Sequence, residues 1–395
     1  MTKKPSYRFT GYTEVWEEKK LGNLGSVEMC RRIFKEETSA EFEIPFFKIG
    51  TFGGEADTYI TREKFEEYKT KFAYPQRGDL LLSASGSIGR VVEYDGDEAY
   101  YQDSNIVWLN HHGKINNKFL KAFYKIVSWS GIEGTTIKRL YNKNILETDI
   151  SLPSLSEQTA IGSFFQDIDQ LISLQQRKLE VLKEQKKTYL KLLFSAKGQT
   201  KPALRFAGFE DEWKEVKLGG IGEIQTGNTP PTNEEDNYEK NGFPWVTPTD
   251  INSLVLQTTS KQLSEVGKSK ARIAKSGSIL VTCIASIGKN TLVRTDSAFN
   301  QQINSLTPSE KYSSYFLLTQ SEIWSRYMLS VAGAGTMQII NKSDFSNIKT
   351  MVPTLPEQEA IGSFFQDLDK AIAKQEEKVN QLKESKQTLL RKMFF

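Results

Sequence analysis

The chain has 395 residues, which predicts two or three domains, and its hydrophobic fraction of 38% is high enough to exclude a disordered chain. Its 52 basic and 49 acidic residues leave a net charge of only +3, so any nucleic-acid-binding surface must be local. With only two cysteines and two adjacent histidines, a four-ligand Cys/His zinc site is excluded. The sequence contains neither a long apolar run nor a signal sequence, so we expect no membrane segment and a location in the bacterial cytoplasm.

Residues 1–151 have the pattern of a mixed α/β domain. Short runs rich in β-branched and aromatic residues, bounded by Gly, Asp and Asn, predict strands. These runs lie at residues 20–29, 45–51, 78–85, 89–94 and 99–109. Helices are predicted at residues 64–72 and 117–129.

A helical region follows at residues 152–197 and recurs at residues 352–395. Leu152–Phe194 and Val352–Phe394 share 23 of 43 residues at an offset of 200, including the unbroken run AIGSFFQD. Weaker similarity at offsets of 197 and 199 links the segments that precede the two helices. The chain is therefore an internal repeat of a globular half followed by a long helix. Ser154 with Glu157, and Thr354 with Glu357, predict a capping box at each helix start.

Both helical regions carry a heptad seam, which predicts that they pair with each other. Polar residues interrupt the two seams at equivalent places, at Gln175 and Gln375 and at Lys186 and Lys386. The apolar pairing residues are Ile161, Phe165, Ile168, Ile172, Leu179, Leu182, Tyr189 and Leu193, and Ile361, Phe365, Leu368, Ile372, Val379, Leu382, Leu389 and Met393. Because the first helix ends where the second half begins, paired helices must run antiparallel about an approximate twofold axis. The alternative is that each helix lies on its own domain.

Residues 198–351 repeat the mixed α/β pattern, with strands predicted at 243–250, 276–283, 289–295 and 299–308 and a helix at 314–329. The predicted fold is α+β, with two mixed α/β domains separated by two long antiparallel helices that form a coiled coil. A helix of about 35 residues is about 52 Å long, which is close to the length of about fifteen base pairs.

The sequence contains no recognisable catalytic motif, and a phosphate-binding glycine loop is absent. Asp57, Glu67 and Lys69 superficially follow the nuclease pattern of two carboxylates and a lysine, but we interpret them as solvated residues. We interpret His111 and His112 as surface residues of a turn. The sequence therefore predicts a chain that is not an enzyme by itself.

These features resemble the DNA specificity subunit of a Type I restriction-modification system. The resemblance covers essentially the whole chain and rests on the helix starts LPSLSEQ and VPTLPEQ, the W-x-x-x-K-L-G opening of each half and the S-I-G-[RK] turns. It implies two target recognition domains, each of which contacts one half of a bipartite site in double-stranded DNA. The domains would be residues 1–151 and 198–351, separated by helical spacer regions at 152–197 and 352–395.

The resemblance also implies partners. Two modification subunits would bind the helices and methylate adenine N6 with S-adenosylmethionine. Two restriction subunits would add cleavage that requires ATP and magnesium. This chain would hold none of these cofactors itself.

Polar and basic residues on loops shared by both halves are our candidates for DNA contact. They comprise the S-I-G-[RK] turns, the polar segments near residues 102 and 301, and the densest basic cluster of each half. The alternative is that the turns and amides only support strands and that the charged runs are solvated. The candidates are Arg31, Arg32, Lys35, Ser87, Arg90, Gln102, Asn105, Lys138, Arg139, Lys268, Lys270, Arg272, Lys275, Ser286, Lys289, Gln301, Asn304 and Gln338.

Phe164 and Phe364, one residue off the seam, together with Gln158 and Gln358, are candidates for binding the modification subunits. Packing of these side chains against the chain's own domains is the alternative. Two further function classes stay open at this stage. One is a coiled-coil adaptor that joins proteins without binding DNA, and the other is a stand-alone nuclease or methylase, whose motifs the sequence lacks.

Overall fold

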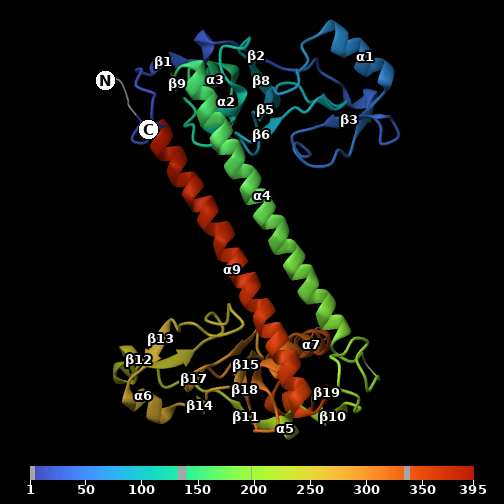
Figure 1. Cartoon of the computed structure of the whole chain (residues 1–395), viewed down its shortest axis with the longest axis vertical. Helices are drawn as coiled ribbons and strands as arrows, with labels where there is room; N and C mark the ends of the chain where they lie inside the picture. The colour runs from blue at the N-terminus through green and yellow to red at the C-terminus, as the bar shows by residue number, and fades with distance from the viewer. Residues whose placement is uncertain (1–4, 132–138, 197, 333–338) are drawn as a thin grey trace. The chain divides into compact units, whose positions relative to one another are not determined.

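The computed structural model describes residues 5–131, 139–196, 198–332 and 339–395. The chain divides into two units, one of residues 1–176 with 377–395 and one of residues 177–376 (Figure 1). Each unit therefore contains one globular half, the first part of the long helix that leaves it, and the last part of the other long helix.

The first unit contains two sheets and a short strand pair. A four-stranded antiparallel sheet has the order β2-β8-β5-β6, a three-stranded sheet has the order β4-β3-β7, and β1 pairs with β9. The strands are β1 (Glu17–Lys20), β2 (Ser26–Glu28), β3 (Ile44–Phe47), β4 (Tyr59–Ile60), β5 (Leu80–Ser83), β6 (Val91–Glu93), β7 (Tyr100–Tyr101), β8 (Ile106–Asn110) and β9 (Asp149–Leu152). The helices of this half are α1 (Arg62–Lys71), α2 (Asn117–Tyr124) and α3 (Asn142–Leu146).

The second unit repeats this architecture. Its sheets have the orders β11-β18-β15-β16 and β13-β12-β17-β14, and β10 pairs with β19. The strands are β10 (Lys214–Lys217), β11 (Gly222–Thr226), β12 (Tyr238–Val246), β13 (Lys261–Leu263), β14 (Ile273–Ala274), β15 (Ile279–Thr282), β16 (Asn290–Leu292), β17 (Ser297–Phe299), β18 (Ile303–Pro308) and β19 (Lys349–Val352). The helices are α5 (Leu218–Ile221), α6 (Glu265–Lys270), α7 (Ser314–Ala332) and α8 (Lys342–Asn347).

Two long, uninterrupted helices leave the two globular halves, α4 (Leu155–Leu192) and α9 (Leu355–Phe394). Both have an apolar seam of the kind that stabilises a helix by burial rather than by propensity alone. The predicted mixed α/β domains with two long helices are confirmed.

In the first unit the end of α9 completes the core of the domain from which α4 starts. The Phe394 ring lies 5.0 Å from Phe119 of α2, 6.3 Å from Phe165 of α4 and 6.3 Å from Trp16, measured between centroids. Since the end of α9 contacts the start of α4, the two helix segments run antiparallel in this unit.

In the second unit the end of α4 takes the equivalent position. Phe194, just after α4, lies 5.4 Å from Phe316 of α7, 5.9 Å from Phe365 of α9 and 6.1 Å from Trp213, between ring centroids. The helix segments are therefore antiparallel here as well. Phe194 and Phe394, the aromatic residues that end the two helical repeats, therefore pack in a domain core as well as against the other long helix.

Candidate DNA-recognition surfaces and helix junctions

Each long helix starts at an ion pair between a buried glutamate and a partly buried arginine. Arg8 donates two hydrogen bonds to the Glu157 carboxylate, at 2.6 and 2.7 Å, and Arg205 donates two to Glu357, both at 2.7 Å. The capping boxes are therefore wrong in their carboxylate half, because a bidentate arginine contact is stronger than a contact with the backbone N–H of the helix start. The hydroxyl half is confirmed only for the first box, where Ser154 Oγ accepts from the Glu157 N–H at 3.4 Å. Among the described residues the Thr354 hydroxyl does not form the equivalent bond.

The glutamines that follow these glutamates are also used inside the chain. Gln158 Oε1 accepts from the Asn116 N–H at 2.9 Å, and its amide nitrogen donates to the Pro153 carbonyl at 2.9 Å. Gln358 accepts from the Ser313 N–H at 3.1 Å in the same way. Both glutamines are only 2% exposed. The structure therefore does not place Gln158 and Gln358 on a partner-binding surface, and they instead join each long helix to the loop before α2 or α7.

Phe164 and Phe364 are half-buried against their own units. Phe164 packs edge-on against Phe9 at 5.4 Å, and Phe364 packs against Phe206 at 5.8 Å and Tyr189 at 5.0 Å. These contacts favour the alternative in which both phenylalanines pack on the chain's own domains.

All predicted seam residues are at least partly buried. The fully buried ones are Ile161, Phe165, Ile172, Leu193, Ile361, Phe365, Val379 and Met393, and the half-buried ones are Ile168, Leu179, Leu182, Tyr189, Leu368, Ile372, Leu382 and Leu389. Leu190 and Leu390 are buried too, although they lie one residue past the seam. The heptad pattern missed them because the helix ends pack into domain cores.

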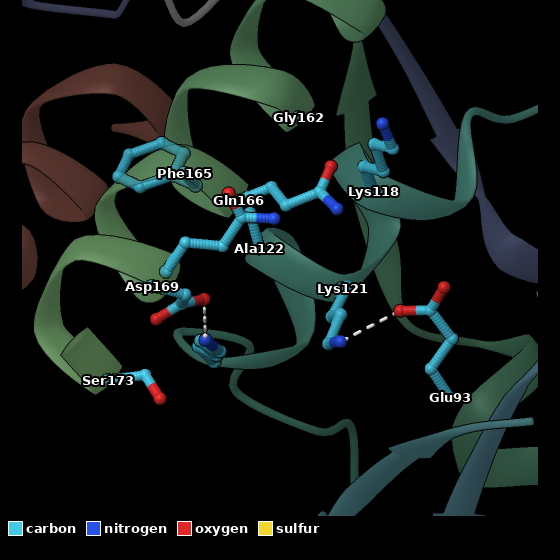
Figure 2. Close-up of a pocket in the computed structure, with 11 residues that line it drawn as sticks. Glu93, Lys118, Lys121, Ala122, Gly162, Phe165, Gln166, Asp169 and Ser173 are labelled. Atoms are coloured by element: carbon cyan, nitrogen blue, oxygen red, sulfur yellow. Dashed lines mark hydrogen bonds and ion pairs between the residues drawn. The ribbon is translucent and has the colours of Figure 1, made fainter. Parts of the chain in front are cut away.

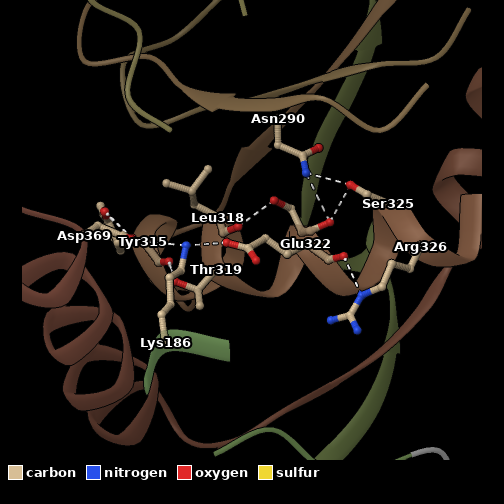
Figure 3. A network of polar contacts seen from close by, with 10 residues as sticks. Lys186, Asn290, Tyr315, Leu318, Thr319, Glu322, Ser325, Arg326 and Asp369 are labelled. Atoms are coloured by element: carbon tan, nitrogen blue, oxygen red, sulfur yellow. Dashed lines mark hydrogen bonds and ion pairs between the residues drawn. The ribbon is translucent and has the colours of Figure 1, made fainter. Parts of the chain in front are cut away.

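The lysine that interrupts the first seam lies in an acidic network of the second unit (Figure 3). Lys186 Nζ is 2.5 Å from Glu322 of α7 and 3.0 Å from Asp369 of α9, and the Tyr315 hydroxyl donates to Asp369 at 3.0 Å. Burial alone would lower the pKa of Lys186, but the two carboxylates raise it. The cation is therefore firmly held between α4, α7 and α9.

The equivalent lysine of the second seam lies in a basic network of the first unit. Lys386 of α9 contacts Asp169 of α4, and Lys125 binds the same carboxylate at 2.7 Å. Burial, together with the neighbouring Lys125, lowers the pKa of Lys386 to about 8 despite the Asp169 contact. Asp169 is itself partly buried, yet the two lysines lower its pKa.

The S-I-G-R turn between β5 and β6 is held by a side-chain hydrogen bond. Ser83 Oγ donates to the Ser87 carbonyl at 2.5 Å and accepts from the Arg90 N–H at 2.9 Å. Gly89 has a φ of +83°, which a residue with a Cβ rarely adopts. The side chains of Ser87 and Arg90 are exposed, and Arg90 donates to the Phe52 carbonyl at 2.6 Å.

The S-I-G-K turn between β15 and β16 has the same construction. The Thr282 hydroxyl donates to the Ser286 carbonyl and accepts from the Lys289 N–H, and Gly288 has a φ of +87°. Lys289 is exposed and Ser286 is half-buried. Both turns therefore present a basic side chain from a fixed backbone.

In the first unit the turn between β7 and β8 lies beside the S-I-G-R turn. Asn105 Oδ1 accepts from Ser85 Oγ at 2.8 Å, and Arg139 donates to Ser104 Oγ at 3.3 Å. Ser85 and Arg139 also form a β-bridge. The structure thus brings Asn105 and Arg139 to one polar surface with the S-I-G-R turn.

Other candidates of the first half lie around the same turn. Arg32 binds Asp103 at 2.9 Å, and Gln102 accepts from the Ile49 N–H at 3.0 Å. Arg31 instead lies over the Phe72 ring, 5.3 Å from its centroid, and Lys35 is exposed. Arg32 and Gln102 therefore extend the polar surface.

In the second unit the candidates gather less closely. The Gln301 side-chain oxygen accepts a hydrogen bond from the Thr229 hydroxyl. The Arg272 guanidinium donates to the Thr226 carbonyl at 2.5 Å, and the Arg272 backbone N–H donates to Asn228 Oδ1 at 2.7 Å. These residues form a polar surface around the segment after β11. The remaining lysines of the basic cluster are paired with acidic neighbours, Lys268 with Glu265, Lys270 with Glu234 and Lys275 with Asp296.

The structure contradicts the prediction that Asn304 contacts DNA. This residue lies within β18, is 2% exposed, accepts from the Thr226 hydroxyl at 2.7 Å and donates to Cys283 Sγ at 3.2 Å. The predicted equivalence of Asn105 with Asn304 fails because the β17–β18 turn is one residue shorter than the β7–β8 turn. In the sheet Ile106 pairs with Ser83, as Ile303 pairs with Thr282. Asn304 therefore belongs to the core and is not a DNA-contact candidate. Lys138 and Gln338 lie outside the described residues.

The residues considered for catalysis have structural partners. Asp57 pairs with Lys48 at 2.8 Å and Glu67 with Lys71 at 3.0 Å. His111 is 7% exposed and its Nε2 lies 2.5 Å from Asn117 Oδ1, so it is not the surface residue that we expected. Among the described residues no group of three or more His, Cys, Asp or Glu side chains is arranged to hold a metal ion. No helix within the described residues is long and apolar enough to cross a membrane.

Comparison with known proteins gives the family. The sequence profile of the family described as Type I restriction modification DNA specificity domain matches the chain twice, over residues 13–184 and 210–384. These matches include most of both globular halves and of both long helices. The chain therefore belongs to this family.

Individual relatives agree with this assignment. A type I restriction enzyme specificity subunit of Haemophilus influenzae is 51% identical over 152 residues, which are 38% of this chain and 40% of that protein. The MjaX specificity subunit of Methanocaldococcus jannaschii is 24% identical over 351 residues, 79% of this chain and 76% of that protein.

A solved structure shows the same fold. The crystal structure of the Type I restriction-modification S subunit from M. genitalium matches with a TM-score of 0.67 at 16% identity and covers 100% of this chain and 99% of that one. A second structure, from work on complex assembly and conformational transition of the type I R-M system, has a TM-score of 0.55 at 18% identity and covers 98% and 99%.

Proposed function

We propose that this chain is the specificity subunit of a Type I restriction-modification system. Each globular half contacts one half of a bipartite DNA site, and α4 and α9 set the spacer between the half-sites. The observation that carries the proposal is one architecture present twice, with two long helical segments that share 23 of 43 residues and with different side chains on the two candidate surfaces. The chain binds no cofactor in this scheme, because methylation and cleavage belong to its partners.

The side chains beside the S-I-G-[RK] turn differ between the two units, which supports recognition of two different half-sites. At equivalent β-bridges, Ser85 faces Arg139 in the first unit and Ile284 faces Ile339 in the second. Polar side chains beside the first turn and apolar side chains beside the second suit different base edges, since the hydrogen-bonding pattern of the major groove differs for each base pair.

The similarity of the helices supports docking of two copies of one partner. Identical subunits bind most easily to a surface that is offered twice. These partners would be two modification subunits, which methylate adenine N6 with S-adenosylmethionine. Two restriction subunits would add ATP-dependent cleavage with magnesium.

Methylome sequencing of a host that expresses the complex tests this function. A bipartite methylated sequence with a fixed spacer is expected. Insertion of one heptad into both α4 and α9 adds about 10 Å of helix, which corresponds to a spacer longer by about three base pairs. Seven residues inserted after Gly198, outside both helices, form the matched control. An unchanged spacer in the heptad variant contradicts the role of the helices, and failure of the complex to retard DNA in a mobility shift contradicts DNA recognition.

A further inference from the structure

The chain segments that follow β5 and β15 have the same backbone partners in the two units. Ala84, just after β5, and Cys283, just after β15, each donate from the backbone N–H to the turn that precedes β8 or β18, both at 2.8 Å. Their carbonyls accept from the Leu140 and Ile340 N–H groups, at 2.8 and 2.9 Å. Each unit therefore holds one short extended segment between the same two neighbouring segments.

The next residue of each segment forms an isolated β-bridge, and the bridged side chains differ between the units. Ser85 faces Arg139 in the first unit, whereas Ile284 faces Ile339 in the second. Ile284 is half-buried and Ile339 is 42% exposed, although both are apolar. Because the backbone pairing is common to both units and the side chains change, these four positions vary as residues that decide what each unit binds are expected to vary.

The residue after each bridge has a left-handed backbone conformation. Gly86 has a φ of +64° and Ala285 has a φ of +63°, so the two chains turn in the same way. Glycine adopts this conformation freely, but alanine is strained in it. The second unit thus keeps the turn that presents Ile284 even though its residue there is not glycine.

A polar contact fastens the strand after each turn to a helix. In the first unit Lys121 of α2 binds Glu93 of β6 at 2.8 Å (Figure 2). In the second unit the Asn290 amide of β16 donates to the Ser325 hydroxyl of α7 at 2.7 Å (Figure 3). Both turns are therefore held on two sides, and the bridged side chains project from a fixed backbone.

The groups around the isoleucine pair suit DNA. Lys289, on the same turn as Ile284, is exposed and has no ion-pair partner among the described residues, unlike the lysines of the basic cluster in this unit. Gln301, in the adjoining turn before β18, is exposed as well. A lysine can neutralise a phosphate, and an amide can bond a base edge. The C5-methyl group of thymine is the apolar group that a base pair offers in the major groove.

We propose that Ile284 and Ile339 contact the C5-methyl group of a thymine in the major groove of the half-site that the second unit binds. The first unit has Ser85 and Arg139 at the equivalent positions, so a thymine methyl group gains no apolar partner there. This inference rests on the proposed recognition of DNA, and it names a chemical group that the second unit recognises.

Replacing thymine by uracil tests the proposal, because this change removes the methyl group and keeps the hydrogen-bonding atoms of the base. Duplexes with the methylated target sequence, and with uracil in one half-site at a time, are titrated with the chain in complex with its modification subunit, and binding is followed by fluorescence anisotropy. Uracil in the half-site of the second unit is expected to weaken binding about fourfold, as loss of one buried methyl group does. I339A is expected to bind the thymine and uracil duplexes equally well.

A matched control variant is L204A, because Leu204 is also 42% exposed and lies in the segment after α4. This variant is expected to keep the fourfold preference for thymine, and thermal melting checks that every variant is folded. Equal binding of thymine and uracil duplexes by the wild type overturns the thymine contact and leaves the proposed function intact. A uracil effect that persists in both I284A and I339A also overturns it, since other residues would then contact the methyl group. A complex that prefers no DNA sequence contradicts the proposed function and the inference together.

Discussion

Lys186 Nζ lies 3.0 Å from Asp369 Oδ1, which joins the end of α4 to the start of α9 within the second unit. The first unit contains the same pair with the helices exchanged, Lys386 with Asp169. The two pairs are related by the offset of 200 residues that relates the helix sequences. Polar residues that interrupt an apolar seam often fix how two helices align along their length. Each of these lysine–aspartate pairs joins α4 to α9 and can fix their alignment in this way.

Replacing Lys186 by Met is expected to lower the free energy of unfolding by about 3 kcal/mol, since the largely buried Asp369 would be left without a cation beside the half-buried Glu322. The double variant K186M/D369L is expected to lose less, because the uncompensated Asp369 charge is removed as well. Urea unfolding measures both. K187M, at an exposed neighbouring lysine, is the control and is expected to change stability by less than about 0.5 kcal/mol. A single variant as stable as this control contradicts the prediction.

The stability contributed by Lys386 is expected to depend on pH. The pKa of this lysine is lowered from 10.5 to about 8, first by burial and then by Lys125, so the unfolded chain binds more protons between these pH values. Its contribution to stability is therefore reduced below pH 8 and rises as pH increases from about 8 to about 10.5. The difference in unfolding free energy between the wild type and K386M is expected to grow in favour of the wild type over this window, measured in urea at several pH values. Parallel pH profiles contradict this.

Much of the architecture follows from the sequence because the repeat and the heptad seam are regular. The partners of buried polar side chains cannot be predicted from the repeat or from the seam. Lys186 and Lys386 interrupt the seams visibly, but Glu322 and Lys125, which complete their networks, come from α7 and from the end of α2, and no local pattern links them to the helices. Glu157 looked like a capping residue, yet its partner Arg8 lies 149 residues away. The repetition of Arg8 as Arg205 is the one sequence signal that could have found this pair.

Replacing Arg8 by Met is expected to destabilise the first unit by about 3 kcal/mol, because Glu157 is fully buried and would lose its bidentate partner. The variant R8M/E157L removes both charges and is expected to recover part of the loss. Hydrogen exchange of the amides at the start of α4 checks that the effect is local. Equal destabilisation in the single and double variants would show that packing of the arginine stem, rather than its charge, holds the helix start.

Gln301 and Asn304 give the sharpest test of the recognition surface, because the sequence proposes both for DNA contact and the structure separates them. Gln301 is exposed, whereas Asn304 is buried in β18 and bonds Thr226 and Cys283. Q301A is expected to alter the preferred sequence of the second half-site, or to weaken binding, without changing thermal stability. N304A is expected to cost about 1–3 kcal/mol of stability, since it leaves the Thr226 hydroxyl without its buried acceptor. Methylation mapping and urea unfolding of the two variants check this, and a folded, fully stable N304A with a changed target sequence would return Asn304 to the DNA-contact residues.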